Sequence, residues 1–363
     1  MRTWRLADAW RARGIVAAMR VLAGDIGGTK TAVAIAEIDD RRIRLRRHKT
    51  YPSAQWPSLE AVVGDFLGTE APPRVAGFGV AGAVVRGRAQ ITHLPWIVEE
   101  RRLSRRLRIP AVTLLNDFVA QALGISYVSP RGLVTLRRGS PERGGPIAVL
   151  GAGTGLGQAA LIPCGTGMTV AASEAGHVEY GPRDATEDRL VAFVRGRAGR
   201  ATREQFLSGR GLKNLYDFLR EDGFAAEDPA VAAEIAASPD PAPVIAVRGL
   251  EGSDRLCVRV LEMFSSIYGS EAANTGIQYR ATGGVDISGG IAGKILPAIR
   301  RGPFLQAFLE KPPMEELVSK MRVRVVVEPR VGTFGAAAAA YRMTVTETRR
   351  FSTLKTRSRR RRE

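Results

Sequence analysis

An aspartate and a pair of glycines separate two apolar segments near the start of the chain. Residues 21–35 read Val-Leu-Ala-Gly-Asp-Ile-Gly-Gly-Thr-Lys-Thr-Ala-Val-Ala-Ile. Gly27 and Gly28 can supply the positive φ angles and absent side chains of a tight turn whose backbone N–H groups approach a phosphate. Asp25 would be repelled by that phosphate unless a cation lay between them, so the stretch predicts a Mg²⁺-nucleotide site. The alternative is an ordinary hairpin with solvent-facing polar residues.

A second glycine-rich turn has the same surroundings. An apolar segment at 147–150 leads into Gly-Ala-Gly-Thr-Gly-Leu-Gly at 151–157, and a second apolar segment follows. Neither turn meets the competing phosphate motifs, because Lys30 lacks the preceding glycine of a Walker loop and Leu156 occupies a glycine position of the dinucleotide fingerprint. The repetition therefore indicates an internal duplication with one phosphate-binding hairpin in each half.

A polar pair, Asn116 and Asp117, closes the apolar segment at 111–115. The carboxyl end of a strand is where α/β folds place their chemistry, so this pair is a candidate for catalysis. The alternative is that Asp117 simply caps the helix predicted to begin at residue 119.

Further polar residues stand in the second half of the chain. Glu174 and His177 lie three positions apart on a predicted loop, and a third glycine turn, Gly289-Gly290, follows the apolar segment at 284–287. Histidine is also a common metal ligand, but residues 178–195 contain no cysteine, so a zinc-binding role for His177 is disfavoured.

Strands alternating with helices must position these residues, which predicts an α/β architecture. Helical spacing is clearest at 59–66, with Ser58 as the expected cap, and helices dominate up to residue 277. An alanine-rich helix is expected at 331–341. A length of 363 residues is enough for two packed domains.

Composition narrows the function classes. The net charge of +18 is high, but the arginines are scattered and no set of base-stacking aromatics accompanies them, so nucleic-acid binding is not expected. No apolar run is long enough to span a membrane. Two distant cysteines, Cys164 and Cys257, fit a reducing cytoplasm. The segment before Met19 could be a targeting peptide, although an unstructured extension is favoured.

These motifs, in this order, resemble the bacterial ATP-dependent glucokinase family of the actin-like ATPase superfamily, from Met19 to about Arg342. The resemblance implies a two-domain actin-like, ribonuclease H-like α/β fold with a cleft between the domains. The implied divisions are a basic extension at 1–18, a small domain at 19–118 plus 332–345, a large domain at 119–331, and a basic tail at 346–363, with both ends disordered.

The resemblance also assigns roles to matched positions. Asp117 would be the general base for the sugar 6-hydroxyl, and Asn116, Glu174, His177 and Glu204 would hold other hydroxyls. The implied ATP-binding residues are Gly24, Asp25, Gly27, Gly28, Thr29, Lys30, Gly151, Gly153, Thr154, Gly155, Gly289 and Gly290. Asp25 would help to position Mg²⁺ through water. His93 stands where the family commonly has asparagine, which puts the nearby hydroxyl contacts in doubt.

The implied activity is transfer of the ATP γ-phosphate to the 6-hydroxyl of glucose. Two alternatives are enzymes of the same fold that act on another hexose or use another phosphate donor. The high positive charge makes inorganic polyphosphate a candidate donor. An alternative of another class is a non-catalytic sugar-sensing regulator, against which the presence of both Asp25 and Asp117 argues. Glucose, ATP and Mg²⁺ are the expected ligands of a cytoplasmic homodimer that contacts neither nucleic acid nor membrane.

Overall fold

The computed structural model describes residues 18–39, 42–165 and 167–343. The chain divides into two compact units. The first comprises the residues up to Ser129, Pro163–Val170 and the residues from Glu328 onward, and the second comprises Pro130–Ile162 and Ala171–Val327. The predictions for the two chain ends, at residues 1–17 and 346–363, lie outside the described residues.

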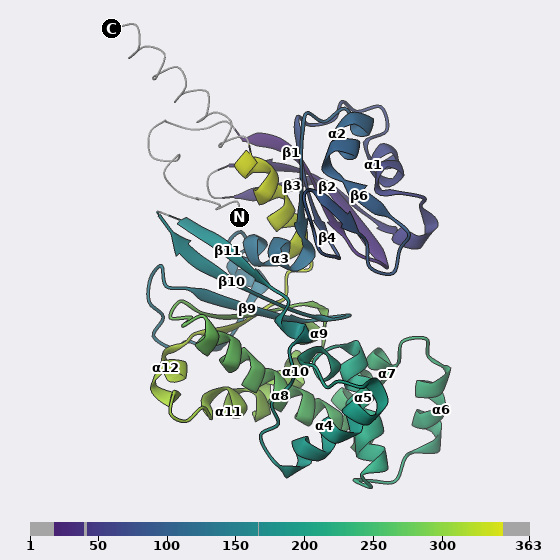
Figure 1. Ribbon diagram of the computed structural model, residues 1–363, viewed down its shortest axis with the longest axis vertical. Helices are drawn as coiled ribbons and strands as arrows, with labels where there is room; N and C mark the ends of the chain where they lie inside the picture. The colour runs from purple at the N-terminus through teal and green to yellow at the C-terminus, as the bar shows by residue number, and fades with distance from the viewer. Residues whose placement is uncertain (1–17, 40–41, 166, 344–363) are drawn as a thin grey trace, which may run out of the picture. The chain divides into compact units, whose positions relative to one another are not determined.

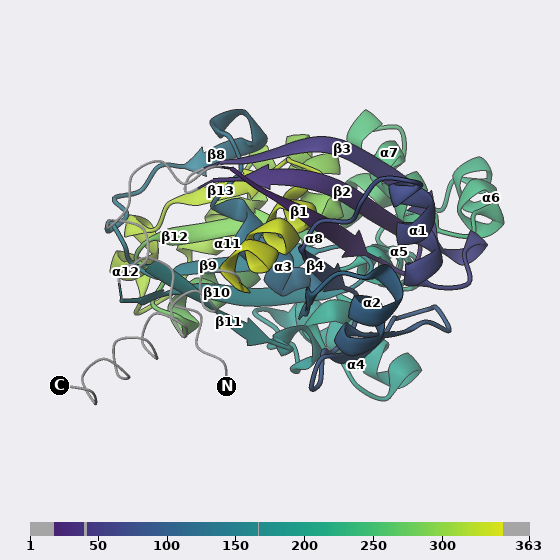
Figure 2. The ribbon, with the colours of Figure 1, turned by 90° about the horizontal axis from the view of Figure 1, so that it is seen from above.

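The first unit is built on a five-stranded sheet with the order β3-β2-β1-β4-β7. Its strands are β1 (Met19–Ile26), β2 (Lys30–Ile38), β3 (Ile43–Pro52), β4 (Val75–Val80) and β7 (Ala111–Asn116). β1, β2 and β3 form an antiparallel meander, whereas β1, β4 and β7 are parallel. Both ribbon views show β1, β2 and β3 as neighbouring strands (Figures 1 and 2). A separate pair of short strands consists of β5 (Arg88–Gln90) and β6 (Ile97–Glu99).

Helices cover both faces of this sheet, because consecutive buried residues of β1 and β4 make both faces apolar. Leu22 and Ile26 of β1 join a buried cluster that includes residues of α1 (Leu59–Leu67) and α2 (Glu100–Leu107). Val21 and Ala23 join another cluster with the helix at residues 331–343. The predicted cap of α1 is confirmed, since the Ser58 hydroxyl accepts from the Ala61 N–H at 3.3 Å.

The helix at 331–343 packs at backbone contact, which explains its many alanines and glycines. A Cβ atom at Gly77 of β4 would lie 2.2 Å from the Ala336 carbonyl oxygen. One at Gly335 would lie 1.7 Å from the carbonyl oxygen of Ala120, in α3 (Asp117–Ile125). These approaches keep α3 in the first unit, whereas the sequence-based boundary assigned residues from 119 to the second domain.

A second sheet has six strands in the order β11-β10-β9-β12-β13-β8, and it lies in the second unit except for the ends of β10 and β11 that fall within Pro163–Val170. Its strands are β8 (Leu133–Arg137), β9 (Ile147–Ala152), β10 (Leu156–Cys164), β11 (Gly167–Ser173), β12 (Gly284–Ser288) and β13 (Val323–Val326). β9 pairs antiparallel with β10 and parallel with β12, which in turn pairs parallel with β13. This repeats the arrangement of the first sheet, as the predicted duplication requires.

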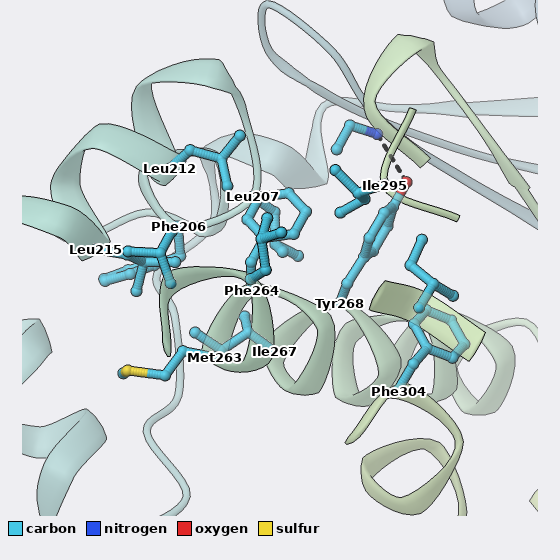
Figure 3. Close-up of a cluster of buried hydrophobic side chains, with 14 of the residues drawn as sticks. Phe206, Leu207, Leu212, Leu215, Met263, Phe264, Ile267, Tyr268, Ile295 and Phe304 are labelled. Atoms are coloured by element: carbon cyan, nitrogen blue, oxygen red, sulfur yellow. Dashed lines mark hydrogen bonds between the residues drawn. The ribbon is translucent and has the colours of Figure 1, made fainter. Parts of the chain in front are cut away.

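A helical layer packs against the second sheet around α8 (Arg255–Gln278), whose buried side chains fill the core drawn in Figure 3. The other helices of this unit are α4 (Ala185–Ala198), α5 (Gly209–Glu221), α6 (Pro229–Ala237), α7 (Pro241–Glu251), α9 (Gly290–Lys294), α10 (Leu296–Arg300), α11 (Pro303–Leu309) and α12 (Glu315–Lys320). Short 3₁₀ turns are η1 (Ser53–Gln55), η2 (Pro130–Gly132), η3 (Ala175–His177) and η4 (Arg203–Gln205).

Candidate active site

Two predicted site carboxylates of the first unit lie at the carboxyl ends of its parallel strands. In the strand register, Asp25 of β1 is paired with Gly79 of β4, and Gly79 is paired with Leu115 of β7. A Cβ atom at Gly79 would lie 2.8 Å from the Ala120 Cβ and 3.6 Å from the Asp117 Cα. The glycine on the intervening strand therefore allows the start of α3 to approach the sheet, which places Asp117 on the same edge as Asp25.

Asn116, and not Asp117, is the N-cap of α3. Its Oδ1 accepts from the N–H groups of Phe118 at 2.9 Å and Val119 at 3.2 Å, and its Nδ2 donates to the Gly82 carbonyl at 3.3 Å. The interpretation of Asp117 as the cap is therefore wrong. Asp117 is the first helical residue, and its Oδ1 accepts from the Phe118 N–H at 2.8 Å.

Asp25 occupies a setting in which a negative charge is costly. Burial, and secondly the negative charge of Asp117, raise the pKa of the Asp25 carboxyl from 3.8 to about 7. Within the described ranges, no residue donates a hydrogen bond to this carboxylate. A Cβ atom on Gly332 would lie 2.3 Å from Asp25 Oδ2, so a larger residue there would displace the carboxylate from its present position. An uncompensated carboxylate in such a cradle suits Mg²⁺, which commonly takes one or two carboxylates besides phosphate and water oxygens.

The raised pKa of Asp25 makes a pH-dependent stability prediction. In the folded chain Asp25 holds its proton up to about pH 7, whereas in the unfolded chain it ionises near 3.8. Its contribution to folding is therefore present at low pH and is lost as the pH rises to about 7. For the metal-free protein, we expect the difference in the free energy of unfolding between Asp25→Asn and the parent chain to grow in favour of the variant from pH 4 to 7. Above pH 7 this difference should stay constant. Urea unfolding across this range measures it; a pH-independent difference would mean that Asp25 ionises normally.

Ser53 stabilises the first glycine turn, between β1 and β2, through two hydrogen bonds. The Ser53 hydroxyl donates to the Gly27 carbonyl at 2.8 Å, and its N–H donates to the Thr29 carbonyl at 3.0 Å. The expectation of positive φ angles at Gly27 and Gly28 is wrong, because neither adopts one. Gly28 is required by space: a Cβ atom there would lie 2.5 Å from the Thr92 carbonyl oxygen. It would also lie 3.3 Å from the Cβ of His93, which places His93 beside this turn.

The second glycine turn, between β9 and β10, has donors available for an anion. The Gly153 N–H donates to the Gly155 carbonyl at 2.8 Å. In the part of the chain that the structure describes, the N–H groups of Thr154 and Gly155 have no acceptor. A Cβ atom at Gly289, whose φ is +84°, would lie 2.4 Å from the Ala152 carbonyl oxygen. The turns at 153–155 and 289–290 therefore lie against each other within the second unit.

A buried tyrosine that sequence analysis did not identify supports both of these turns. The Tyr268 hydroxyl of α8 accepts from the Ala152 N–H at 2.9 Å (Figure 3) and donates to the Ser288 carbonyl at 3.3 Å. Burial raises the pKa of Tyr268, so the hydroxyl keeps the proton that it donates. Each bonded strand ends at one glycine turn. The sequence could have pointed to Tyr268 only as a tyrosine hydroxyl among the apolar residues of a long buried helix.

We expect Tyr268→Phe to lower the free energy of unfolding by about 1–3 kcal/mol, because the buried Ala152 N–H loses its acceptor. It should also weaken nucleotide binding, since both strand ends lose a common support. Urea unfolding and calorimetric titration with ADP measure the two effects. Tyr216→Phe is the matched control, because the Tyr216 hydroxyl bonds to Glu227 and to neither turn. Unchanged stability and ADP affinity in Tyr268→Phe would contradict the supporting role.

The remaining predicted sugar-binding residues belong to two adjacent turns of the second unit. Exposed Glu174 directly precedes η3, exposed His177 ends it, and half-buried Glu204 lies in η4. The Arg203 N–H donates to the Val178 carbonyl at 2.9 Å, which joins the two turns. The structure therefore brings Glu174, His177 and Glu204 into one region, while Asn116 and Asp117 belong to the first unit.

Comparison with known proteins agrees with these features. Residues 22–343 match the model of the Glucokinase family. A glucokinase of Nostoc punctiforme is 38% identical over 338 residues, covering 89% of this chain and 99% of its own length. The structure is similar to that of a glucokinase from an Antarctic psychrotroph, with a TM-score of 0.77, 26% identity and coverage of 89% of this chain and 98% of that one.

A glucokinase from Balamuthia mandrillaris, solved in complex with glucose, has the same fold, with a TM-score of 0.71, 21% identity and coverage of 93% and 96% of the two chains. The fold is thus the actin-like ATPase fold of sugar kinases, with two α/β units. Taken with the family match over nearly the whole described chain, the conclusion is that this chain belongs to the glucokinase family.

Proposed function

We propose that the protein is an ATP-dependent glucokinase, which transfers the γ-phosphate of ATP to the 6-hydroxyl of glucose. The observation that carries the proposal is the pair of carboxylates, Asp25 and Asp117, at the carboxyl ends of the parallel strands in a chain of this family. Asp25 is suited to hold the metal of a metal-nucleotide, and Asp117 is suited to accept the proton of a hydroxyl nucleophile. Phosphoryl transfer needs both functions.

In the proposed reaction, the glucose O6 forms a bond to the γ-phosphorus while the bond from that phosphorus to the bridging oxygen of ADP breaks. The O6 proton passes to the Asp117 carboxylate as the reaction proceeds, so no covalent enzyme intermediate is needed. Asn116 supports this step locally, because its two bonds to backbone N–H groups fix the helix turn that carries Asp117.

Sugar recognition is proposed for Asn116, Glu174, His177 and Glu204. Neighbouring sugar hydroxyls can each donate a hydrogen bond, and carboxylates accept them well. A sugar that lacks one of these hydroxyls, or directs it differently, would leave a polar group without its partner, and this penalty would give selectivity.

Nucleotide contacts are proposed for the glycine turns. Gly24 and Asp25 lie in β1, Gly27, Gly28 and Thr29 form the turn after it, and Lys30 begins β2. In the second unit the proposed contacts are Gly151, Gly153, Thr154, Gly155, Gly289 and Gly290. Mg²⁺ would be held near Asp25, where it would neutralise phosphate charge.

The proposal also includes a cytoplasmic location and a homodimer. No helix of the described residues is long and apolar enough to cross a membrane. Cys164 and Cys257 are free thiols, and Cys257 is buried, which suits a reducing compartment. The dimer follows from the family resemblance, and light scattering of the purified chain measures it.

A coupled assay over a panel of hexoses and phosphate donors tests the proposed function. We expect ADP formation that depends on glucose, with weaker or no turnover for epimers of glucose. If the chain phosphorylated glucose with polyphosphate in the absence of nucleotide, polyphosphate and not ATP alone would be a phosphate donor. Absence of sugar-dependent ATP consumption for every hexose would overturn the enzyme assignment and favour a sugar-sensing regulator.

A further inference from the structure

Glu204 makes a contact that sugar binding does not explain. Its Oε2 accepts the N–H of Leu156 at 3.0 Å, and Leu156 is the first residue of β10, directly after the second glycine turn. A Cβ atom at Gly155 would lie 2.4 Å from the same oxygen. The turn therefore closes around this carboxylate, and a larger residue at 155 would displace it.

The segment that carries Glu204 is joined to the same turn by the backbone. The Gly209 N–H donates to the Gly153 carbonyl at 2.9 Å. The buried Ser208 hydroxyl donates to the Glu204 carbonyl at 2.7 Å and accepts from the Gly211 N–H at 3.1 Å. The segment at 204–209 and the turn at 153–156 are thus bonded at both ends of their contact.

The segment is also fixed to the core beneath it. Phe206 and Leu207 are fully buried and belong to the same apolar cluster as Phe264 of α8, which Figure 3 draws. Arg203 forms an ion pair at 3.3 Å with Glu271, which lies about one turn after Tyr268 in α8, and the Glu271 side chain is 3% exposed. Because Arg203 on one side of Glu204 and Phe206 and Leu207 on the other are anchored, the segment holds the carboxylate against the glycine turn.

We propose that Glu204 is a positioning residue for the second glycine turn, and that it couples sugar binding to the affinity of this turn for the nucleotide phosphates. The coupling rests on the proposed function, whereas the positioning of the turn does not. A hydrogen bond to an ionised carboxylate is stronger than one between neutral groups, so the bond to Leu156 fixes the peptide that follows the unpaired Thr154 and Gly155 donors.

Sugar hydroxyls that donate to the same carboxylate would hold it in this orientation. A sugar would then favour the phosphate-binding form of the turn, and by thermodynamic reciprocity a nucleotide would raise sugar affinity by the same factor. Glu174 lacks such a contact, because no hydrogen bond joins its side chain to the turn within the described residues. Glu174 is therefore the matched control for Glu204.

The test is the affinity of the full chain for Mg²⁺-ADP in the absence of sugar, measured by isothermal titration calorimetry. We expect Glu204→Ala and Glu204→Asp to bind ADP about tenfold more weakly, the shorter carboxylate being unable to reach Leu156. Glu204→Gln keeps an acceptor oxygen and should lose much less. Glu174→Gln should bind ADP as the parent chain does. Circular dichroism confirms that each variant is folded, and the aspartate variant replaces the alanine variant if the latter unfolds.

A second titration measures glucose affinity with and without a non-hydrolysable ATP analogue. We expect the ratio of the two affinities to fall toward one in Glu204→Asp and to persist in Glu174→Gln, although both bind glucose more weakly. Unchanged sugar-free ADP affinity in Glu204→Ala and Glu204→Asp would overturn the positioning role. If the protein phosphorylated no sugar, the proposed function would fail while the ADP titration would still decide this inference.

Discussion

Replacing Asp117 by asparagine is expected to lower kcat by about 10²- to 10⁴-fold, the range in which a positioned general base contributes. Asparagine keeps the size of the side chain and can still accept from the Phe118 N–H, so α3 should form as before. Glucose affinity should survive, because the lost function is proton acceptance. Steady-state kinetics together with glucose titration separate the two effects.

Asp65→Asn is the control for this substitution. Asp65 lies on α1 of the same unit, where it accepts from Tyr51 and Lys49 at the protein surface. The control should retain the parent kcat. A kcat for Asp117→Asn within a few-fold of the parent value would show that another group accepts the proton.

Gly332→Ala is expected to lower kcat/KM by about 10²-fold, the cost of a misplacement of roughly 1 Å at a reacting centre. The added Cβ atom would lie 2.3 Å from Asp25 Oδ2, so the carboxylate must turn away from its present position. Gly332 lies in the first turn of the helix at 331–343, where alanine is otherwise a good helix former. The loss should therefore appear in activity and Mg²⁺-nucleotide affinity, with the fold retained.

Gly64→Ala is the matched glycine control. Gly64 lies in α1, and a Cβ atom there would meet nothing within 4 Å. We expect it to keep full activity and to gain slightly in stability. If Gly332→Ala were equally active, the position of the Asp25 carboxylate would not matter for turnover, and the metal assignment would lose its support.

Local patterns predicted the parts of the fold that are local in origin. The glycine turns at 27–28 and 153–155 interrupt strongly apolar segments, so each hairpin and its strands could be placed from sequence. The order of glycine turns, Asn116-Asp117 and the Glu174–His177 loop then indicated the family. Hydrophobic spacing places the strands without any knowledge of tertiary contacts, whereas the family came from the resemblance of the ordered motifs.

Sequence could not predict what depends on contacts between distant segments. Gly28 is required by the Thr92 carbonyl and Gly332 by the Asp25 carboxylate, and neither approach has a local signature. The Tyr268 hydroxyl bonds to Ala152 and Ser288, which lie 116 and 20 residues away in the sequence. The alternative interpretation of Asp117 as the cap of α3 named the wrong member of an adjacent polar pair, because both residue types are good caps.

The most direct test of the central claim is phosphorus NMR of a mixture of glucose, Mg²⁺-ATP and the purified chain. The account predicts that the γ-phosphate signal of ATP is replaced by signals of ADP and glucose 6-phosphate in equal amounts, and that Asp117→Asn largely abolishes this conversion. Persistence of ATP in the presence of the folded parent chain, or its conversion to ADP and free phosphate without a sugar phosphate, would contradict the account.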